Sequence, residues 1–193
     1  MLWMNILSSI LGIKVDIRGI PDQSANLFVS NHVTYLDIII INKLLPVNFI
    51  AKEEISSWPV IGRLASKTGT LFIKRGDNVE SSKMIYEMQE RFKLQNKIVF
   101  FPEGKIGNGK RVRKFHYKLF KSIENKELYI QPIAIRYPIG YPINNNYSEI
   151  ISDKSLKGEM FSLYLKFLMR RRSHVILIFL DNCLLYTSDA ADD

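Results

Sequence analysis

Residues 27–51 carry the sequence LFVSNHVTYLDIIIINKLLPVNFIA, and this stretch decides the class of fold. It holds a short apolar run over residues 27–30, a helix-length segment over residues 36–45 that ends at Pro46, and a second apolar run over residues 47–51. Short apolar runs bounded by turn residues are typical of buried strands, and proline cannot continue a helix. The stretch therefore predicts a strand, a helix and a second strand in succession.

The same alternation continues along the chain. Further strands are predicted at residues 70–74, 97–101, 129–137 and 174–180, and further helices at residues 58–67, 78–95, 115–125 and 156–172. Pro59 fits the first turn of its helix, whereas Pro132 lacks the N–H that a sheet ladder needs and predicts a bulged or edge strand. Strands that alternate with helices indicate an α/β domain, for which we expect a mixed, largely parallel central sheet flanked by helices.

The composition limits the classes of partner and of cofactor. The chain has 193 residues and carries 27 Lys and Arg against 19 Asp and Glu, a formal charge of +8. This excess favours an anionic partner such as a phospholipid surface, a nucleic acid, a phosphorylated substrate or an acidic carrier protein. A single cysteine excludes a disulfide framework and a cysteine-based zinc site. No residues have metal-ligand spacing and no glycine-rich loop matches a nucleotide-binding fingerprint, so we expect neither a metal nor another cofactor.

A single domain is expected over residues 1–182, and the two ends of the chain need separate interpretation. Residues 1–13 have no charged side chain and are too short to span a bilayer. They are expected either to pack on the core or to lie as a helix in the membrane interface. Residues 183–193 resemble the translation of a transposase adapter used in sequencing libraries, and we interpret them as an appended tail.

Asn31, His32 and Asp37 occupy the junction between the first predicted strand and the helix that follows. On one continuous helix, His32 and Asp37 would be about 140° apart around the axis, and on a strand they would face opposite sides. They can meet only where the chain turns between them. Asp37 could then accept a hydrogen bond from one imidazole nitrogen and leave the other as a base for a substrate hydroxyl. The alternative is a surface histidine beside an unrelated aspartate at a helix N-terminus.

Four segments in order resemble the glycerolipid acyltransferases, the family of the 1-acylglycerol-3-phosphate acyltransferases. Asn31-His32-x4-Asp37 resembles the first motif of that family. Gly69-Thr-Leu-Phe-Ile-Lys-Arg75 resembles the second motif, Phe101-Pro-Glu-Gly104 the third, and Ile130-Gln-Pro-Ile-Ala-Ile135 the fourth. The four motifs span about half of the chain, and they imply a fold like that of glycerol-3-phosphate acyltransferase.

The resemblance implies a role for each motif. His32 is implied to be the general base, oriented by Asp37, and the acceptor hydroxyl is implied to attack an acyl thioester with no acyl-enzyme intermediate. Arg75 is implied to bind the phosphate of the acceptor through its guanidinium fork. The other implied substrate-binding positions are Asn31, Gly69, Phe72, Lys74, Glu103, Gly104, Lys105 and Pro132. The implied donor is acyl-CoA or an acyl carrier protein, and backbone N–H groups near Gly104 are expected to stabilise the oxyanion.

The third motif departs from the family after Gly104. The family usually continues with Thr-Arg-Ser, whereas Lys105, Ile106 and Gly107 follow here, so Ile106 stands where a phosphate-contacting arginine is expected. Residues 112–120 are similar to a Phe-His stretch of relatives that act on other lysolipids, including lyso-ornithine lipids. The expected acceptor is therefore a lysolipid, either lysophosphatidic acid or another lysophospholipid or lyso-ornithine lipid.

Seven cationic side chains and no acidic one lie within the 17 residues 105–121. Near an anionic bilayer each lysine or arginine contributes on the order of 1 kcal/mol, and an acidic acyl carrier protein would be attracted too. No nucleic acid is expected as a partner, because no stacking motif or nucleic-acid-binding fold accompanies the charge. We expect a membrane-associated acyltransferase, peripheral or monotopic, on the cytoplasmic face. The rivals are a non-catalytic lipid-binding relative and, less favoured, a basic nucleic-acid-binding protein.

Overall fold

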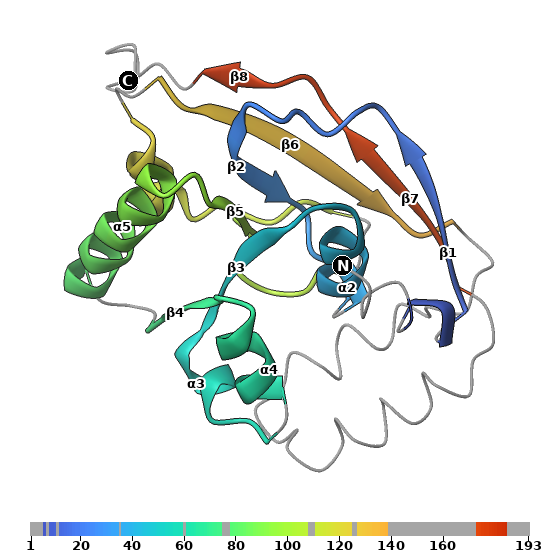
Figure 1. The fold of residues 1–193 in the computed structure, drawn as a ribbon, viewed down its shortest axis with the longest axis horizontal. Coiled ribbons are helices and arrows are strands. Elements are labelled where there is room, and N and C mark those ends of the chain that lie inside the picture. The colour runs from blue at the N-terminus through green and yellow to red at the C-terminus, as the bar shows by residue number, and fades with distance from the viewer. Residues whose placement is uncertain are drawn as a thin grey trace.

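The computed structural model describes residues 6, 8–10, 12–34, 36–59, 61–74, 78–107, 111–124, 127–138 and 173–184. Within these ranges the strands are β1 (Ile13–Arg18), β2 (Ala25–Ser30), β3 (Val47–Lys52), β4 (Leu71–Ile73), β5 (Lys97–Phe100), β6 (Tyr129–Arg136), β7 (Ser173–Phe179) and β8 (Cys183–Leu184). The helices are α2 (Leu36–Leu44), α3 (Glu53–Ser56), α4 (Ile61–Lys67), α5 (Asn78–Lys93) and the 3-10 helix η1 (Tyr117–Ser122). Figure 1 shows strands and helices mixed along the chain, which confirms the predicted α/β class.

One sheet contains the eight strands of the described residues, in the order β1-β7-β6-β2-β5-β3-β4, with β8 paired to β6. Neighbouring strands are parallel except that β7 and β8 run antiparallel to β6. The predicted mixed, largely parallel sheet is confirmed. Because β2 is parallel to both of its neighbours, β5 and β6, the segments that follow these three strands leave the sheet at the same edge.

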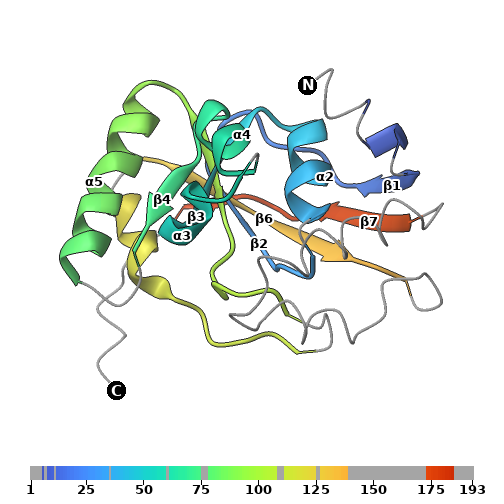
Figure 2. The same cartoon turned by 90° about the horizontal axis from the view of Figure 1, so that it is seen from below.

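Two apolar clusters cover the two faces of the sheet and hold β2 between them. Phe28 packs in one cluster with Ile40 of α2, while its neighbour Leu27 packs in the other with Met88 of α5. All four side chains are 0% exposed. Successive strand residues point to opposite faces, so a single strand can serve both clusters. Figure 2 shows α5 at the opposite end of the molecule from β1 and β7, with α2 nearer to that pair.

The predicted helices differ from the observed ones in two places. Helix α4 begins at Ile61, and Pro59 therefore precedes it, because residues 53–56 form α3 and the chain turns before α4. The helix predicted over residues 115–125 is η1, shorter and of the 3-10 type. The helix predicted over residues 156–172 lies outside the described residues.

Strand β6 is an interior strand, so the edge position predicted as one alternative for Pro132 is wrong. The bulge alternative is not found at Pro132 in the pairing with β2, whose register shift lies between Ala25 and Leu27. The carbonyl of Pro132 accepts the N–H of Leu180 at 3.0 Å. The N–H and C=O of one strand residue point to the same side, so the missing N–H faces this side as well. There the β8 ladder has ended at Ile130 and the β7 ladder starts only at Ile133. Proline is tolerated because it costs no ladder bond at this position.

The first residues of the chain also depart from expectation. Strand β1 was not predicted, although Ile13, Val15 and Ile17 alternate with polar residues as a strand requires. Ile13 belongs to this strand and is 7% exposed, so it is not part of an interface helix. Gly12, at φ 60°, ends the helical residues 8–10 that precede it. Residues 1–5, 7 and 11 of the predicted helix lie outside the described residues.

The last described residues are Cys183 and Leu184, which pair as β8 with Ile130 and Tyr129. They are the first two residues of the segment interpreted as an appended tail, and residues 185–193 lie outside the described ranges. That interpretation stays a prediction. In the part of the chain that the structure describes, no helix combines the length and the apolar character that crossing a bilayer requires.

Candidate active site

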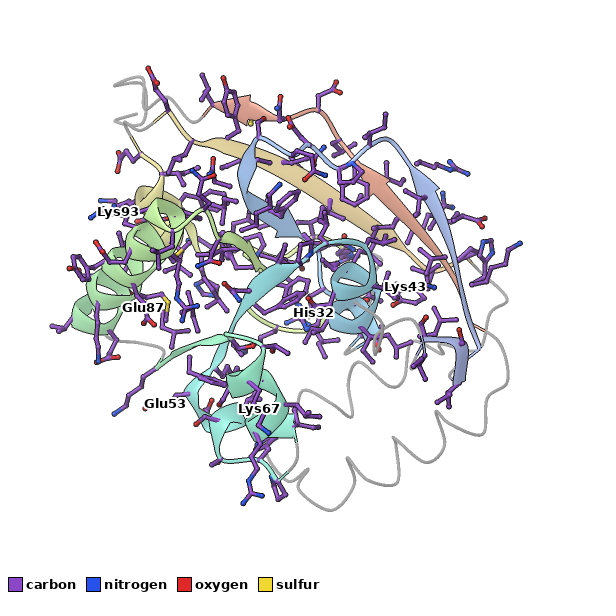
Figure 3. The ribbon with its side chains drawn as sticks, viewed as in Figure 1. His32, Lys43, Glu53, Lys67, Glu87 and Lys93 are labelled. Atoms are coloured by element: carbon purple, nitrogen blue, oxygen red, sulfur yellow. The ribbon has the colours of Figure 1, made fainter. Side chains whose placement is uncertain are left out.

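The loop between β2 and α2 carries the predicted histidine. Strand β2 ends at Ser30 and α2 begins at Leu36, so His32 lies in the loop and Asp37 lies in the first turn of the helix. Figure 3 shows His32 near the middle of the molecule, beside α2. The predicted placement of both residues is confirmed. The strand before His32 is the second in the chain, because β1 precedes it.

The turn of the chain brings the imidazole onto the carboxylate. His32 Nδ1 lies 2.9 Å from Asp37 Oδ2, and the two side chains are 11% and 0% exposed. With the carboxylate accepting, Nδ1 carries the proton and Nε2 carries the lone pair of the neutral ring. The predicted contact between the two side chains is therefore confirmed, and the alternative of an unrelated histidine and aspartate is wrong.

Four donors surround the Asp37 carboxylate. Besides His32, the backbone N–H groups of Val33 and Thr34 donate to Oδ2 at 2.7 and 2.9 Å. The hydroxyl of Tyr137 donates to Oδ1 at 2.7 Å. A fully buried carboxylate requires such partners, since leaving its oxygens without donors costs several kcal/mol. The orientation of Asp37 is thus fixed by its own loop and by the segment after β6.

Tyr137 is a residue of this site that the sequence did not reveal. It is separated from Asp37 by 100 positions along the chain. Burial raises the pKa of Tyr137 well above its ordinary value, and the nearby Asp37 charge and the hydrogen bond to Asp37 raise it further. The phenol therefore stays protonated and serves as a donor at neutral pH. A signal existed only at the level of topology, since Tyr137 follows a strand that is parallel to β2.

Phe101 fixes the plane of the imidazole. The rings of His32 and Phe101 are stacked, with their centroids 4.0 Å apart and an angle of 12° between their planes. Phe49 stacks on the same Phe101 ring at 6.1 Å. The backbone of His32 is held as well, because its carbonyl accepts the N–H of Gly107 at 2.6 Å. The residues that follow β5 therefore pack directly against the His32 loop.

Three other predicted substrate-binding residues have structural partners. The side-chain amide of Asn31 donates to the carbonyl of Ile135 at 2.9 Å and accepts its N–H at 2.8 Å, which ties the loop to β6. Glu103 is 5% exposed, and its Oε2 accepts the N–H of Arg113 at 3.0 Å. Pro132 lies within β6, farther from the histidine loop than Ile135 is. Their proposed contact with substrate stays a prediction.

The loop after β5 has engaged backbone donors. Gly104 has φ +64°, and its N–H donates to the carbonyl of Phe101 at 2.8 Å. The N–H of Gly107 donates to His32, as described above. These two N–H groups are therefore committed to carbonyl oxygens and are poorly suited to stabilising an oxyanion.

The two side chains after Gly104 differ in exposure. Lys105 is exposed, whereas Ile106, at the position where the family has an arginine, is buried with 9% of its surface exposed.

The second motif lies around β4, which two other strands separate from β2, the strand that precedes His32. Gly69 ends the turn between α4 and β4, Phe72 is half-buried in β4, and Lys74 is exposed after that strand. Strands β5 and β3 separate β4 from β2. These four strands are parallel, so Lys74 and His32 both follow strands that end at the same edge of the sheet. Arg75, the implied phosphate ligand, lies outside the described residues.

No three His, Cys, Asp or Glu side chains of the described residues gather in a way that could hold a metal ion. The expectation that the reaction uses no metal or other cofactor stays a prediction.

Comparison with known proteins identifies the family. A family model described as Acyltransferase matches residues 13–136, which is more than half of the chain. This chain therefore belongs to the Acyltransferase family. The match contains all four motifs, and the predicted resemblance is confirmed.

Particular relatives show how far the likeness extends. The lyso-ornithine lipid O-acyltransferase of Pseudomonas aeruginosa is 36% identical over 135 residues, which cover 70% of this chain and 52% of that protein. The 1-acyl-sn-glycerol-3-phosphate acyltransferase of Neisseria gonorrhoeae is 32% identical over 128 residues, covering 66% and 50%. The chain spans about half the length of the curated relatives it matches.

A solved structure agrees with the fold. The crystal structure of PlsC, the 1-acyl-sn-glycerophosphate acyltransferase of Thermotoga maritima, superposes with a TM-score of 0.64 and covers 94% of this chain and 66% of that one. The sequence identity is 18%, so this likeness bears on the fold alone.

Proposed function

We propose that this protein transfers a fatty acyl group from a thioester to the free hydroxyl of a lysolipid, with His32 as the general base. The observation that carries the proposal is the 2.9 Å contact between His32 Nδ1 and the buried Asp37 carboxylate. This contact keeps the proton on Nδ1 and the lone pair on Nε2, which is the state that a base toward a hydroxyl requires.

The reaction balances without an enzyme nucleophile. His32 Nε2 removes the proton of the acceptor hydroxyl while the hydroxyl oxygen attacks the thioester carbonyl carbon. The tetrahedral intermediate then collapses, the C–S bond breaks and the new ester forms. The imidazolium returns its proton to the leaving thiolate, which departs as a thiol. Proton transfer by a positioned histidine typically contributes about 10²–10⁴-fold to the rate.

The surroundings of Asp37 suit the charge that develops in this reaction. When His32 takes up a proton, the imidazolium lies beside a carboxylate that Tyr137 and two backbone N–H groups hold in place. The stacked ring of Phe101 limits rotation of the imidazole about its axis. A base that is oriented in advance loses no free energy to reorientation at the moment of reaction.

The acceptor that we propose first is a lyso-ornithine lipid, and lysophosphatidic acid is the second. Relatives named lyso-ornithine lipid O-acyltransferase include one 36% and one 35% identical to this chain. Ile106 is buried and uncharged at the position where an arginine for a phosphate is expected, which favours an acceptor without a phosphate. In this proposal Lys74, Lys105 and Arg75 supply the remaining charge near the acceptor.

The donor and the location complete the proposal. The donor is acyl-CoA or an acyl carrier protein, because both present a fatty acyl thioester. Neither proton transfer nor thioester exchange requires a metal or redox cofactor, so we propose none. The protein works at the cytoplasmic face of a membrane as a peripheral or monotopic protein, where a lipid acceptor is present.

The test is mass spectrometry of the products from a mixture of acceptors. Lyso-ornithine lipid, lysophosphatidic acid and lysophosphatidylethanolamine are incubated with the protein and with a long-chain acyl-CoA or acyl carrier protein. We expect diacyl product from the lyso-ornithine lipid at the highest rate. If the protein binds lysolipid but forms no acylated product with either donor, it is a non-catalytic lipid-binding relative and the proposal is wrong.

A further inference from the structure

A strip of exposed cationic and apolar side chains lies beside the candidate active site. We call residues 111–118 the basic strip, and all eight of them are exposed. Its cations are Arg111, Arg113, Lys114 and Lys118, and its large apolar or aromatic side chains are Val112, Phe115 and Tyr117. The last three are 74%, 46% and 65% exposed. Such exposure of apolar side chains within a run of one charge marks a surface that meets a partner.

The basic strip is attached to the segment that packs on His32. The N–H of Arg113 donates to Glu103 Oε2 at 3.0 Å, and the N–H of His116 donates to the carbonyl of Pro102 at 2.8 Å. Pro102 and Glu103 directly follow Phe101, the ring stacked on His32. Figure 2 shows the strip as an extended yellow stretch that leads into η1. Whatever binds the strip is therefore held close to the histidine loop.

The charged side chains of the strip are all cationic. Within the described residues, no ion pair neutralises Arg111, Arg113 or Lys114. Cations attract an anionic surface from a distance, and interleaved aromatic and aliphatic side chains gain free energy by entering the boundary between headgroups and acyl chains. An acidic protein would match the cations but would gain less from Val112 and Phe115. The combination favours a bilayer.

We propose that the basic strip docks this domain on an anionic phospholipid bilayer and thereby holds the His32 loop close to the lipid. This inference deepens the proposed function. It rests on that function in one respect, which is that the acceptor is a lipid of the bilayer to which the strip binds. The two can fail separately, because docking is measured as binding without substrate and acyl transfer as product.

The test is binding of the full chain to phosphatidylcholine vesicles with and without phosphatidylglycerol. The triple variant Arg111→Gln, Arg113→Gln, Lys114→Gln is expected to lose about 100-fold in affinity for the anionic vesicles. The triple variant Val112→Ser, Phe115→Ser, Tyr117→Ser is expected to lose about tenfold. Wild-type binding should fall with added salt and should be weak on phosphatidylcholine alone.

Two matched controls separate docking from net charge and from misfolding. The variant Lys14→Gln, Arg18→Gln, Lys83→Gln removes three exposed cations outside the strip and should change affinity by less than about threefold. Exchanging lysine and arginine within the strip (Arg111→Lys, Arg113→Lys, Lys114→Arg) keeps the charge and should keep the binding. Equal losses in the strip and the control triple would overturn the proposal. So would undiminished vesicle binding by the strip variants, or a loss seen only toward an acidic acyl carrier protein.

Discussion

The hydroxyl of Tyr137 donates to Oδ1 of Asp37 at 2.7 Å, across 100 positions of sequence. The other oxygen of the same carboxylate faces His32. Tyr137, in the segment after β6, therefore holds the Asp37 carboxylate in place through Oδ1, whereas the imidazole of His32 bonds to Oδ2. This places Tyr137 as a positioning residue in the proposed mechanism.

Replacing Tyr137 by phenylalanine removes one donor from a buried carboxylate. We expect Tyr137→Phe to lower the free energy of unfolding by about 1–3 kcal/mol, the usual cost of leaving a buried acceptor without its donor. Urea unfolding at neutral pH measures this change. Phenylalanine retains the ring, so an unchanged free energy of unfolding would mean that the hydrogen bond contributes nothing.

The raised pKa of Tyr137 also predicts how stability depends on pH. The unfolded chain releases the phenol proton near pH 10, whereas the folded chain holds it to a higher pH. Above about pH 10 the unfolded state therefore binds fewer protons, and stability falls as the pH rises. Melting temperatures between about pH 8 and pH 11 should fall more steeply for the wild type than for Tyr137→Phe. Parallel curves would contradict the assignment.

Asn31 holds the histidine loop to β6 by two hydrogen bonds with Ile135. We expect Asn31→Ala to destabilise the protein by about 1–3 kcal/mol, because both backbone groups of Ile135 lose their partner. Asn31→Asp retains the acceptor oxygen but loses the donor, so its free energy of unfolding should lie between those of the wild type and Asn31→Ala. If Asn31 only contacts substrate, neither variant will change the unfolding midpoint.

Gly69 has a backbone reason for its identity that is independent of substrate. It has φ +76°, and a Cβ at this position would lie 2.5 Å from Asn48 Nδ2. Gly69→Ala should therefore cost about 1–3 kcal/mol in the free energy of unfolding. Gln95 is the reciprocal control, since it is an exposed non-glycine residue at φ 61°. Gln95→Gly should be neutral or stabilising, and equal losses in both variants would contradict this explanation.

Much of the architecture could be predicted because its signals are local. The apolar runs and the proline after residue 45 located β2, α2 and β3, and the spacing of His32 and Asp37 required a turn that the observed elements provide. Strand β1 was not predicted, because its alternating residues begin inside the long uncharged run of residues 1–13, which masks the change from one pattern to the other. The position of Pro132 in an interior strand could not be predicted from nearby sequence. Whether a sheet tolerates proline depends on which strand lies beside the missing N–H, and that is set by distant parts of the chain.

The site could be predicted only in part for a similar reason. Motif spacing identified His32 and Asp37, but Tyr137 and Phe101 reach them from other strands, and only the order of the strands brings those residues together. The structural partners of Asn31 and Glu103 were likewise invisible in the sequence, because both are backbone groups, which every residue carries and no side-chain pattern marks.

The most direct test of the central claim is the rate of acyl transfer by His32→Ala, measured with the acceptor and donor on which the wild type is fastest. The account predicts a loss of at least about 100-fold in kcat, with circular dichroism unchanged, because no other group replaces the base. Transfer by the variant at a rate within a few-fold of the wild type would contradict the assignment of His32 as the base.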